Sequence, residues 1–300
     1  MNAGGKVLFV GDISLDTTLR LGYIPQPDEK LHVKIDNESA GGVISNAALA
    51  CRLAGGRPIL AIETGDDLFA DSLLATLQQA GIEIVSRKIP GRTCRAIILI
   101  EPHGEKRLLL EPGVSLYPSV EWVQSLSLTG IDWVHTAVYG DAAWPLIEQA
   151  RLAGSRWSLD LEPATFIEGI AALTPLLEGA EVVFCNQRAL DQLGEHPEQQ
   201  LLDRGVKAVV STLGARGATY VSAIHRADAH YPLTPNLVDT TGAGDCLAGW
   251  FIACMLAGKS PKVSLTEAVY AATYSCERAG AQPSYPDRQQ LAAFQQASQR

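Results

Sequence analysis

The chain has 300 residues, of which 47% are hydrophobic and 19% are charged, and its formal net charge is −9. This length and composition fit a soluble globular protein with one large α/β domain or two modest ones. The acidic charge argues against nucleic-acid binding as the main function, and the apolar runs are too short for a membrane helix.

The cysteines and histidines offer no metal-binding pattern. The six cysteines form no C-x-x-C pair, and most of them lie in apolar stretches. We therefore expect buried thiols in a reducing cytoplasm and neither disulfides nor metal ligands. The six histidines are scattered along the chain, which argues against a zinc site.

The first predicted element is a buried strand at 6–10, which ends at Gly11 and Asp12. Residues 13–19 then alternate between apolar and polar, the period of a strand. Asp16 in this stretch follows the carboxyl end of a first parallel strand, where open α/β sheets bind ligands. The alternative for Asp16 is a solvated residue at a sheet edge.

Three further segments show the charged, extended pattern of exposed strands: 28–39, 95–101 and 106–111. The turn residues at 102–105 predict that the last two segments form a hairpin. Such strands would have one face in water and one face that closes on a substrate or on a partner. An ordinary exposed hairpin of the main sheet is the alternative.

The middle of the chain alternates between predicted strands and predicted helices. A helix of small residues at 40–50 opens with Gly41 and Gly42, and a helix at 70–80 ends at Gly81. Strands are expected at 59–63, 133–136, 157–161, 182–185, 208–211, 218–222 and 224–231, and helices at 142–152, 167–177, 189–193 and 199–203. The alternation predicts a mostly parallel sheet that is covered on both faces.

A glycine-rich turn at 238–245 precedes an apolar helix. Gly242 and Gly244 allow positive φ and a close ligand, and the start of the helix presents unpaired N–H groups to an anion. Asp245 in the first helical turn is placed to deprotonate a hydroxyl that attacks a phosphoryl group. The alternative is a tight strand-to-helix connection with a capping acid. The turn lacks the Lys-Ser/Thr of a P-loop, and Leu247 replaces the third glycine of G-x-G-x-x-G.

This stretch, Asp-Thr-Thr-Gly-Ala-Gly-Asp-x-x-x-Gly, resembles the C-terminal signature of the ribokinase-like (PfkB) carbohydrate kinases. Gly41-Gly42-x-x-x-Asn46 resembles the N-terminal signature, and further matches extend from Gly11 to Ser284. The resemblance implies a three-layer α/β/α fold with a mostly parallel central sheet. It also implies a single kinase domain over 1–300, with a small β-sheet lid formed by about 13–39 and 92–112.

The resemblance also implies the functions of individual residues. The catalytic group comprises the base Asp245 and the anion hole of Gly242, Ala243 and Gly244. The substrate group comprises Asp16, Gly41, Gly42 and Asn46, and the nucleotide group comprises Asn186, Thr212, Gly214, Gly217 and Thr241. A monovalent cation would be held by Asp239, Thr241, Gly280 and Ser284.

The chain departs from the family pattern at two positions. Ile44 stands where a small residue is usual, and Ala189 replaces a Glu that acts on magnesium through water. Asp191 lies two residues out of register with that Glu. Asn186 is retained, and it either caps the following helix or binds the nucleotide.

The sequence therefore predicts a cytoplasmic kinase that uses ATP and Mg²⁺ to phosphorylate a hydroxyl of a sugar or a sugar-like substrate. K⁺ is a further expected ion, and a homodimer joined through the lid is one expected assembly. The alternatives are a nucleoside kinase of the same fold and a sugar- or nucleotide-sensing relative that has lost catalysis.

Overall fold

The computed structural model describes residues 5–101, 106–138, 140–233 and 236–298. Within these ranges nine strands form one sheet in the order β13-β12-β11-β10-β9-β8-β1-β4-β5. The strands are β1 (Lys6–Gly11), β4 (Arg57–Thr64), β5 (Glu83–Lys88), β8 (Trp133–Ala137), β9 (Arg156–Leu161), β10 (Val182–Asn186), β11 (Ala208–Thr212), β12 (Ala218–Ser222) and β13 (Arg226–Ala229). Only β12 runs opposite to the other strands of this sheet, pairing antiparallel with β11 and β13, so the predicted mostly parallel sheet is confirmed.

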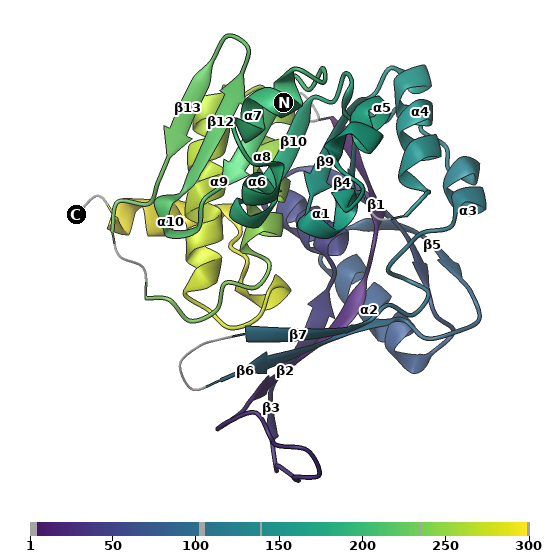
Figure 1. Cartoon of the computed structure of the whole chain (residues 1–300), viewed down its shortest axis with the longest axis vertical. Helices are drawn as coiled ribbons and strands as arrows, with labels where there is room; N and C mark the ends of the chain where they lie inside the picture. Colours follow the sequence, from purple (N-terminus) through teal and green to yellow (C-terminus); the bar gives the residue numbers. More distant parts are fainter. Residues whose placement is uncertain (1–4, 102–105, 139, 234–235, 299–300) are drawn as a thin grey trace.

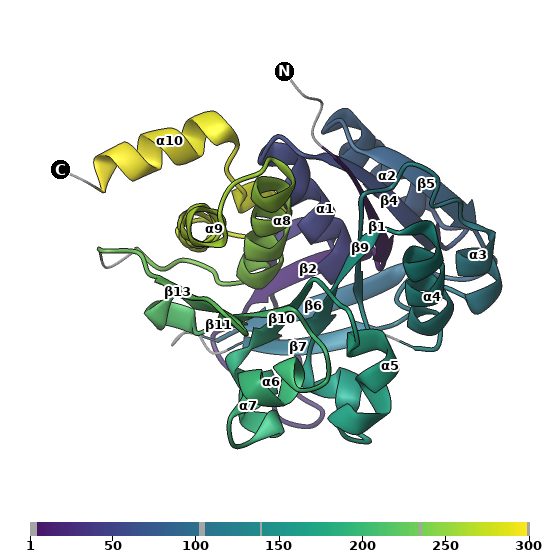
Figure 2. The same ribbon diagram turned by 90° about the horizontal axis from the view of Figure 1, so that it is seen from above.

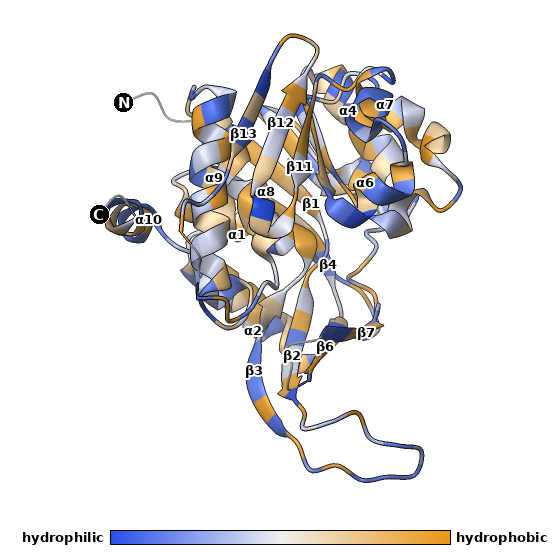
Figure 3. Cartoon of the chain, turned by 60° about the vertical axis from the view of Figure 1, so that its left-hand side comes forward, coloured by the Kyte–Doolittle hydropathy of each residue, from blue (hydrophilic) through white to orange (hydrophobic). Residues whose placement is uncertain are grey.

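Helices cover both faces of this sheet (Figures 1 and 2). One face packs against α1 (Val43–Leu53), α2 (Leu68–Gln79), α8 (Ala243–Leu256), α9 (Pro261–Cys276) and α10 (Arg288–Ala297). The other face packs against α3 (Val120–Ser125), α4 (Ala143–Ala153), α5 (Thr174–Leu177), α6 (Gln187–Leu193) and α7 (Pro197–Leu202). The inner strands of the large sheet are mostly hydrophobic (Figure 3), because both of their faces are buried, whereas the edge strands β5 and β13 are partly exposed. The expected three-layer α/β/α architecture is thus confirmed.

A second sheet projects from the body, and we call it the lid (Figure 1). Among the described residues it contains four strands in the order β3-β2-β6-β7, with bounds β3 (Lys34–Gly41), β2 (Ser14–Arg20), β6 (Cys94–Ile100) and β7 (Lys106–Glu111). Strands β6 and β7 pair antiparallel as predicted, and the expected turn at 102–105 lies outside the described residues. The lid is a sheet of its own, so the alternative of a hairpin in the main sheet is wrong.

Several predicted boundaries were wrong. The charged segment at 28–39 becomes a strand only from Lys34, and the expected strand at 224–231 is limited to β13. The expected helix at 167–177 is a 3-10 turn at Ile170–Leu173 followed by the short helix α5. Gly169 has φ 93° and Pro175 lacks an N–H group, so a continuous helix cannot run through this segment.

Among the α-helices and strands of the described residues, four were not predicted: β5 (Glu83–Lys88), α3, α9 and α10. Two of them have clear start signals in the sequence. Ser260 caps α9, with Pro261 at its first position. Asp287 and Gln290 form a capping box at the start of α10. In the described part of the chain, no helix has both the length and the apolar character needed to cross a bilayer.

Helices α1 and α8 pack unusually closely because of a glycine. A Cβ atom added to Gly249 of α8 would lie 2.2 Å from the carbonyl oxygen of Ala47 and 2.7 Å from the Cβ of Ala50, both on α1. Only a residue without a side chain therefore fits at this position. The contact fixes the spacing of two helices whose N-terminal ends both point to the lid side of the sheet.

We predict that Gly249→Ala lowers the free energy of unfolding by about 2–3 kcal/mol, although Ala is the better helix former, because overpacking forces α1 and α8 apart. Gly244→Ala in the same helix is the matched control, since its Cβ would meet nothing within 4 Å. Urea denaturation of both variants checks the prediction. Equal stability of the two variants would contradict it.

Candidate active site

The turn before α8 is built to receive an anion, and we call residues 241–244 the anion turn. Gly242 has φ 71°, and a Cβ there would lie 2.4 Å from the hydroxyl oxygen of Tyr285. Tyr285 donates a hydrogen bond of 2.7 Å to the Gly242 carbonyl, which holds the turn in place. Gly244 faces open space. The amide of Ala243 donates to the Thr240 carbonyl over 3.4 Å, whereas no acceptor is found among the described residues for the amides of Gly244 and Asp245, which remain available at the positive end of the helix.

Asp245 in the first turn of α8 meets Asn46 of α1. The Asn46 Nδ2 donates to Asp245 Oδ2 over 2.8 Å, across 199 positions in the sequence. Burial raises the pKa of Asp245 well above its usual range, the hydrogen bond from Asn46 lowers it, and nearby Asp160, Glu162 and Asp12 raise it further. A carboxylate whose pKa is moved toward neutrality has the property of a general base.

The other polar side-chain atom of Asn46 has no hydrogen-bond partner in the described structure. Its Oδ1 is buried and accepts no hydrogen bond from the described residues. Buried polar atoms are nearly always paired in folded proteins, so an unpaired one next to a carboxylate indicates a position for a ligand hydroxyl.

Asp16 on β2 lies against the backbone at Gly41. A Cβ added to Gly41 would be 2.1 Å from Asp16 Oδ2, so glycine is required for the carboxylate to lie there. Ser14 donates to Asp16 Oδ1 over 2.5 Å. Asp16 is only 9% exposed, so the alternative of a solvated edge residue is wrong. Its burial raises the pKa of the carboxyl, and the hydrogen bond from Ser14 partly offsets this rise.

Asp12 is a site residue that the sequence analysis did not identify. Its carboxylate accepts hydrogen bonds of 2.9 Å from the amides of Val43 and Ile44, so it caps α1 from the end of β1. Burial raises its pKa to about 6, although these hydrogen bonds lower it. The signal in the sequence was weak, because a cap from 31 residues away has no local pattern.

Ile44 packs in the core against the end of β1. The side chain is fully buried, and a Cβ on Gly11 would lie 2.4 Å from its Cγ1. It therefore fills the space above the glycine that ends β1. The departure from the family pattern is taken up by core packing.

The expected nucleotide residues gather at the ends of β10 and β11. Asn186 and Thr212 are direct partners in these neighbouring parallel strands. Gly214 and Gly217 follow with φ 59° and 85°, and a Cβ on Gly217 would lie 2.1 Å from the Ala229 carbonyl oxygen. The side chain of Asn186 accepts from the amide of Ala189, which is the helix-cap alternative.

The two positions linked to magnesium in the sequence analysis supply no obvious ligand. Ala189 is buried and has no ligating group. Asp191 is exposed and accepts a hydrogen bond of 2.7 Å from Gln187. Among the described residues, no three side chains of His, Cys, Asp or Glu come together in a way that could hold a metal ion.

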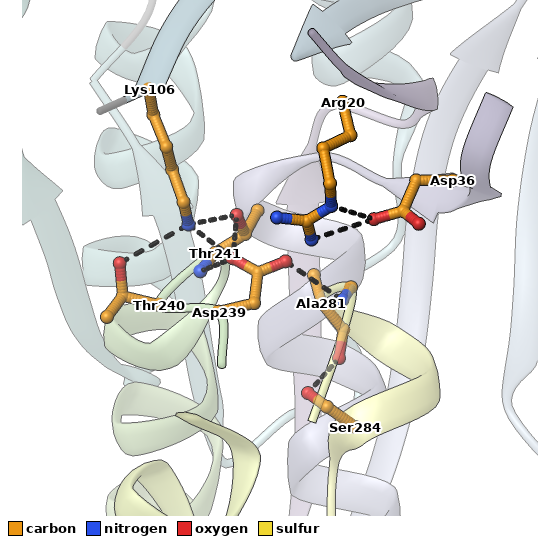
Figure 4. A network of polar contacts seen from close by, with 9 residues as sticks. Arg20, Asp36, Lys106, Asp239, Thr240, Thr241, Ala281 and Ser284 are labelled. Carbon is orange, nitrogen blue, oxygen red and sulfur yellow. Dashed lines mark hydrogen bonds and ion pairs between the residues drawn. The ribbon is translucent and has the colours of Figure 1, made fainter. Parts of the chain in front are cut away.

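The residues expected around a monovalent cation do come together, with one addition (Figure 4). Asp239 accepts from the amides of Thr241 and Gly280, each over 2.9 Å. Ser284 in the same loop as Gly280 donates to the Ala281 carbonyl over 2.6 Å. The ammonium of Lys106 on lid strand β7 forms an ion pair with Asp239, a contact the sequence analysis did not foresee.

Comparison with known proteins gives a consistent result. The pfkB family carbohydrate kinase pattern matches residues 5–288. An ATP-dependent ribose-1-phosphate kinase of Halopiger xanaduensis is 29% identical over 96% of this chain and 97% of its own length. The mouse ribokinase is 25% identical over 95% of this chain and 93% of its own length.

The fold has solved relatives. The crystal structure of a putative ribokinase II of E. coli in complex with ATP and Mg²⁺ superposes with a TM-score of 0.81 at 21% identity, over 98% of this chain and 99% of that one. The family pattern spans nearly all of the sequence, and the fold agrees with it. The chain therefore belongs to the pfkB family of carbohydrate kinases, which transfer a phosphoryl group to an alcohol.

Proposed function

We propose that this ATP-dependent sugar kinase uses Asp245 as its general base and the anion turn as its phosphoryl-binding site. The observation that carries the proposal is the convergence of Asp16, Asn46 and the anion turn with the adjacent Asp245 from three separate parts of the chain. The acceptor is a sugar or a sugar-like alcohol, with a ribose-like sugar or its phosphate as the first candidate, because the relatives above are kinases named for such compounds.

Each residue contributes one step. Asp16 and the free oxygen of Asn46 accept hydrogen bonds from acceptor hydroxyls and fix the orientation of the sugar. Asp245 takes the proton of the attacking hydroxyl, and its raised pKa makes it basic enough to do so. The amides at the start of α8 stabilise the charge that spreads over the transferring phosphoryl group.

The nucleotide and its magnesium ion would lie at the ends of β10 and β11. We infer that Asn186, Thr212, Gly214, Gly217 and Thr241 line the ATP site, with Asn186 acting through its position at the start of α6. Mg²⁺ typically uses one or two carboxylates together with substrate phosphates. Asp160 and Glu162 are the candidates to supply them, because they lie at the carboxyl end of β9, the parallel neighbour of β10. The ion, when bound, neutralises charge on the phosphates.

Three finer expectations accompany this proposal. Potassium at Asp239, Thr241, Gly280 and Ser284 stays an untested prediction, and the ammonium of Lys106 on the same carboxylate argues against it. We place the reaction in the cytoplasm, where ATP is available and the six free cysteines stay reduced. Dimerisation through the lid is supported by Ile97 and Leu109, cross-strand partners that are 39% and 56% exposed.

A screen of acceptors tests the proposal. Thermal shift and ATP turnover are measured with ribose, ribose 1-phosphate, deoxyribose, sugar acids and nucleosides. Turnover with sugars or their phosphates supports it, and a preference for nucleosides would identify a nucleoside kinase instead. Binding without any turnover would identify a sensor.

The first prediction concerns the base. Asp245→Asn should fold and bind ATP but lose about 10³-fold in kcat, because the proton acceptor and its charge are both removed. Steady-state kinetics with the acceptor from the screen measure the loss. If the variant keeps more than about a tenth of the activity, Asp245 is not the base.

The second prediction concerns the pH profile. Loss of the Asn46 hydrogen bond removes a contact that favours the charged form of Asp245, so Asn46→Ala should raise the pKa of the base further. The acidic limb of the kcat/KM profile should then move to higher pH, because activity is lost as the pH falls through the pKa of the base. An unchanged limb would refute the coupling between the two side chains.

The third prediction concerns Asp16. Asp16→Ala should cost on the order of 2–4 kcal/mol in kcat/KM for the acceptor, since substrate hydroxyls lose their partner in a buried site. The affinity for ATP should stay nearly constant, which isothermal titration checks. Wild-type kinetics in this variant would separate the lid from acceptor binding.

A further inference from the structure

Lys106 is the first residue of β7. It lies at the tip of the lid, the end opposite to the one where the lid strands join the body. In the lid register Lys106 pairs with Ile100, which pairs with Arg20, while Leu110 pairs with Ala96 and then Asp16. Side chains of paired residues point to the same face, and so do residues four positions apart in a strand. Lys106 and Asp16 therefore share the face of the lid that is turned to the body.

The two residues mark opposite ends of that face. Strand geometry places Lys106 about 13 Å from Leu110, the residue in the row of Asp16. Leu108 lies between them, is 61% exposed and faces the same way. Thr18 and Ile98, in the row between them, are buried, so this face is covered except at the edge strand β7. Lys106 contacts the body at the tip of the lid, and Asn37 of β3 also lies against Gly280 of the body.

The contact at the tip is made to the residue that holds the anion turn. The Lys106 ammonium pairs with Asp239 Oδ1 and donates to the hydroxyls of Thr241 over 2.9 Å and Thr240 over 3.4 Å (Figure 4). The same Asp239 oxygen accepts from the amide and the hydroxyl of Thr241, over 2.9 Å and 2.7 Å. The other oxygen accepts from the Gly280 amide. One carboxylate therefore joins the lid, the anion turn and the loop after α9.

The carboxylate needs this positive charge. The side chain of Asp239 is only 5% exposed, whereas that of Lys106 is 29% exposed. Burial by itself would raise the pKa of Asp239, but the hydrogen bonds from Lys106, Thr241 and Gly280 lower it to about 2. The two backbone amides are neutral, so Lys106 supplies the compensating charge, and it does so only when the tip of the lid lies on the body.

We propose that Lys106 is a positioning residue of the phosphoryl transfer: its ammonium fastens the tip of the lid to Asp239 and thereby sets the anion turn when the acceptor is enclosed. The inference rests on the proposed function of the anion turn. It follows that the wild-type enzyme carries its own tethered cation at Asp239 and does not require a monovalent ion from solution.

The experiment compares Lys106→Met with Arg107→Met. Arg107 is the neighbouring residue on β7, is paired with Glu101 at the surface and points to the opposite face, so it controls for the loss of a lid charge. Both variants and the wild type are assayed in choline, potassium and ammonium chloride at equal ionic strength. Lys106→Arg, which keeps the charge, is included as the conservative variant.

In choline chloride Lys106→Met should lose about 10–100-fold in kcat with an ATP affinity within about two-fold of the wild type. Ammonium or potassium should restore at least about a third of the loss on a logarithmic scale, because a free cation can then occupy the position beside Asp239. The wild type and Arg107→Met should differ by less than about two-fold among the three salts, and Lys106→Arg should keep kcat within about ten-fold.

A second measurement does not depend on turnover. Ammonium and potassium should raise the thermal midpoint of Lys106→Met relative to choline, without substrates, and should not raise that of the wild type. Full activity of Lys106→Met in choline, or a loss that no cation restores, would overturn the proposal. If the wild type is inactive with every acceptor, the proposed function is refuted. If Lys106→Met nevertheless shows the expected rise of its thermal midpoint in ammonium and potassium, the cation contact at Asp239 still holds.

Discussion

The contact between α1 and α8 is the constraint on which the site depends. Each helix begins at the lid side of the sheet, and each carries one half of a functional pair, Asn46 on α1 and Asp245 on α8. The distance between Asn46 and Asp245 is set where the helices cross at Gly249, because the Ala47 carbonyl oxygen occupies the place of a side chain there. Gly249 thereby sets the position of Asp245, the proposed base, from one turn further along α8.

The N-terminal amides of α1 are capped by a side chain, whereas those of α8 are not, and this difference separates the proposed functions of the two helices. The first amides of α1 are satisfied by the Asp12 carboxylate, so the positive end of that helix is neutralised. Helix α8 has no side-chain cap, and the only carboxylate of its first turn is Asp245. The positive end of α8 therefore remains free to stabilise an incoming anion. In the proposed mechanism one helix start positions the acceptor, and the other receives the phosphoryl group.

Charge compensation divides the carboxylates of the site into two kinds. Asp239 receives an ammonium and several hydrogen bonds, and its pKa is lowered to about 2. Asp245 receives one hydrogen bond from a neutral amide and lies near other carboxylates, so its pKa is raised. Asp239 therefore stays charged and holds the lid and the anion turn in place. Asp245 can gain and lose a proton, which is the requirement for a base.

The sequence by itself determined the layers of the fold and the chemistry of the site. Alternating strands and helices follow from local periodicity, and Gly242, Gly244 and Asp245 are adjacent in the chain, so one short pattern carries the anion turn and the base. Local signals also determined the start of α6 at Asn186, although they left open whether that residue caps a helix or binds a ligand. The structure shows the cap.

Only the tertiary structure decided which distant residues meet. Asp12 caps a helix 31 positions away, Asn46 reaches Asp245 across 199, and Lys106 reaches Asp239 across 133. It also showed that Ile44 fills the space above Gly11. These contacts depend on how helices pack and on where the lid rests. Packing geometry has no local period, so no sequence pattern around Lys106 could reveal that its charge is matched by a buried carboxylate in another part of the chain.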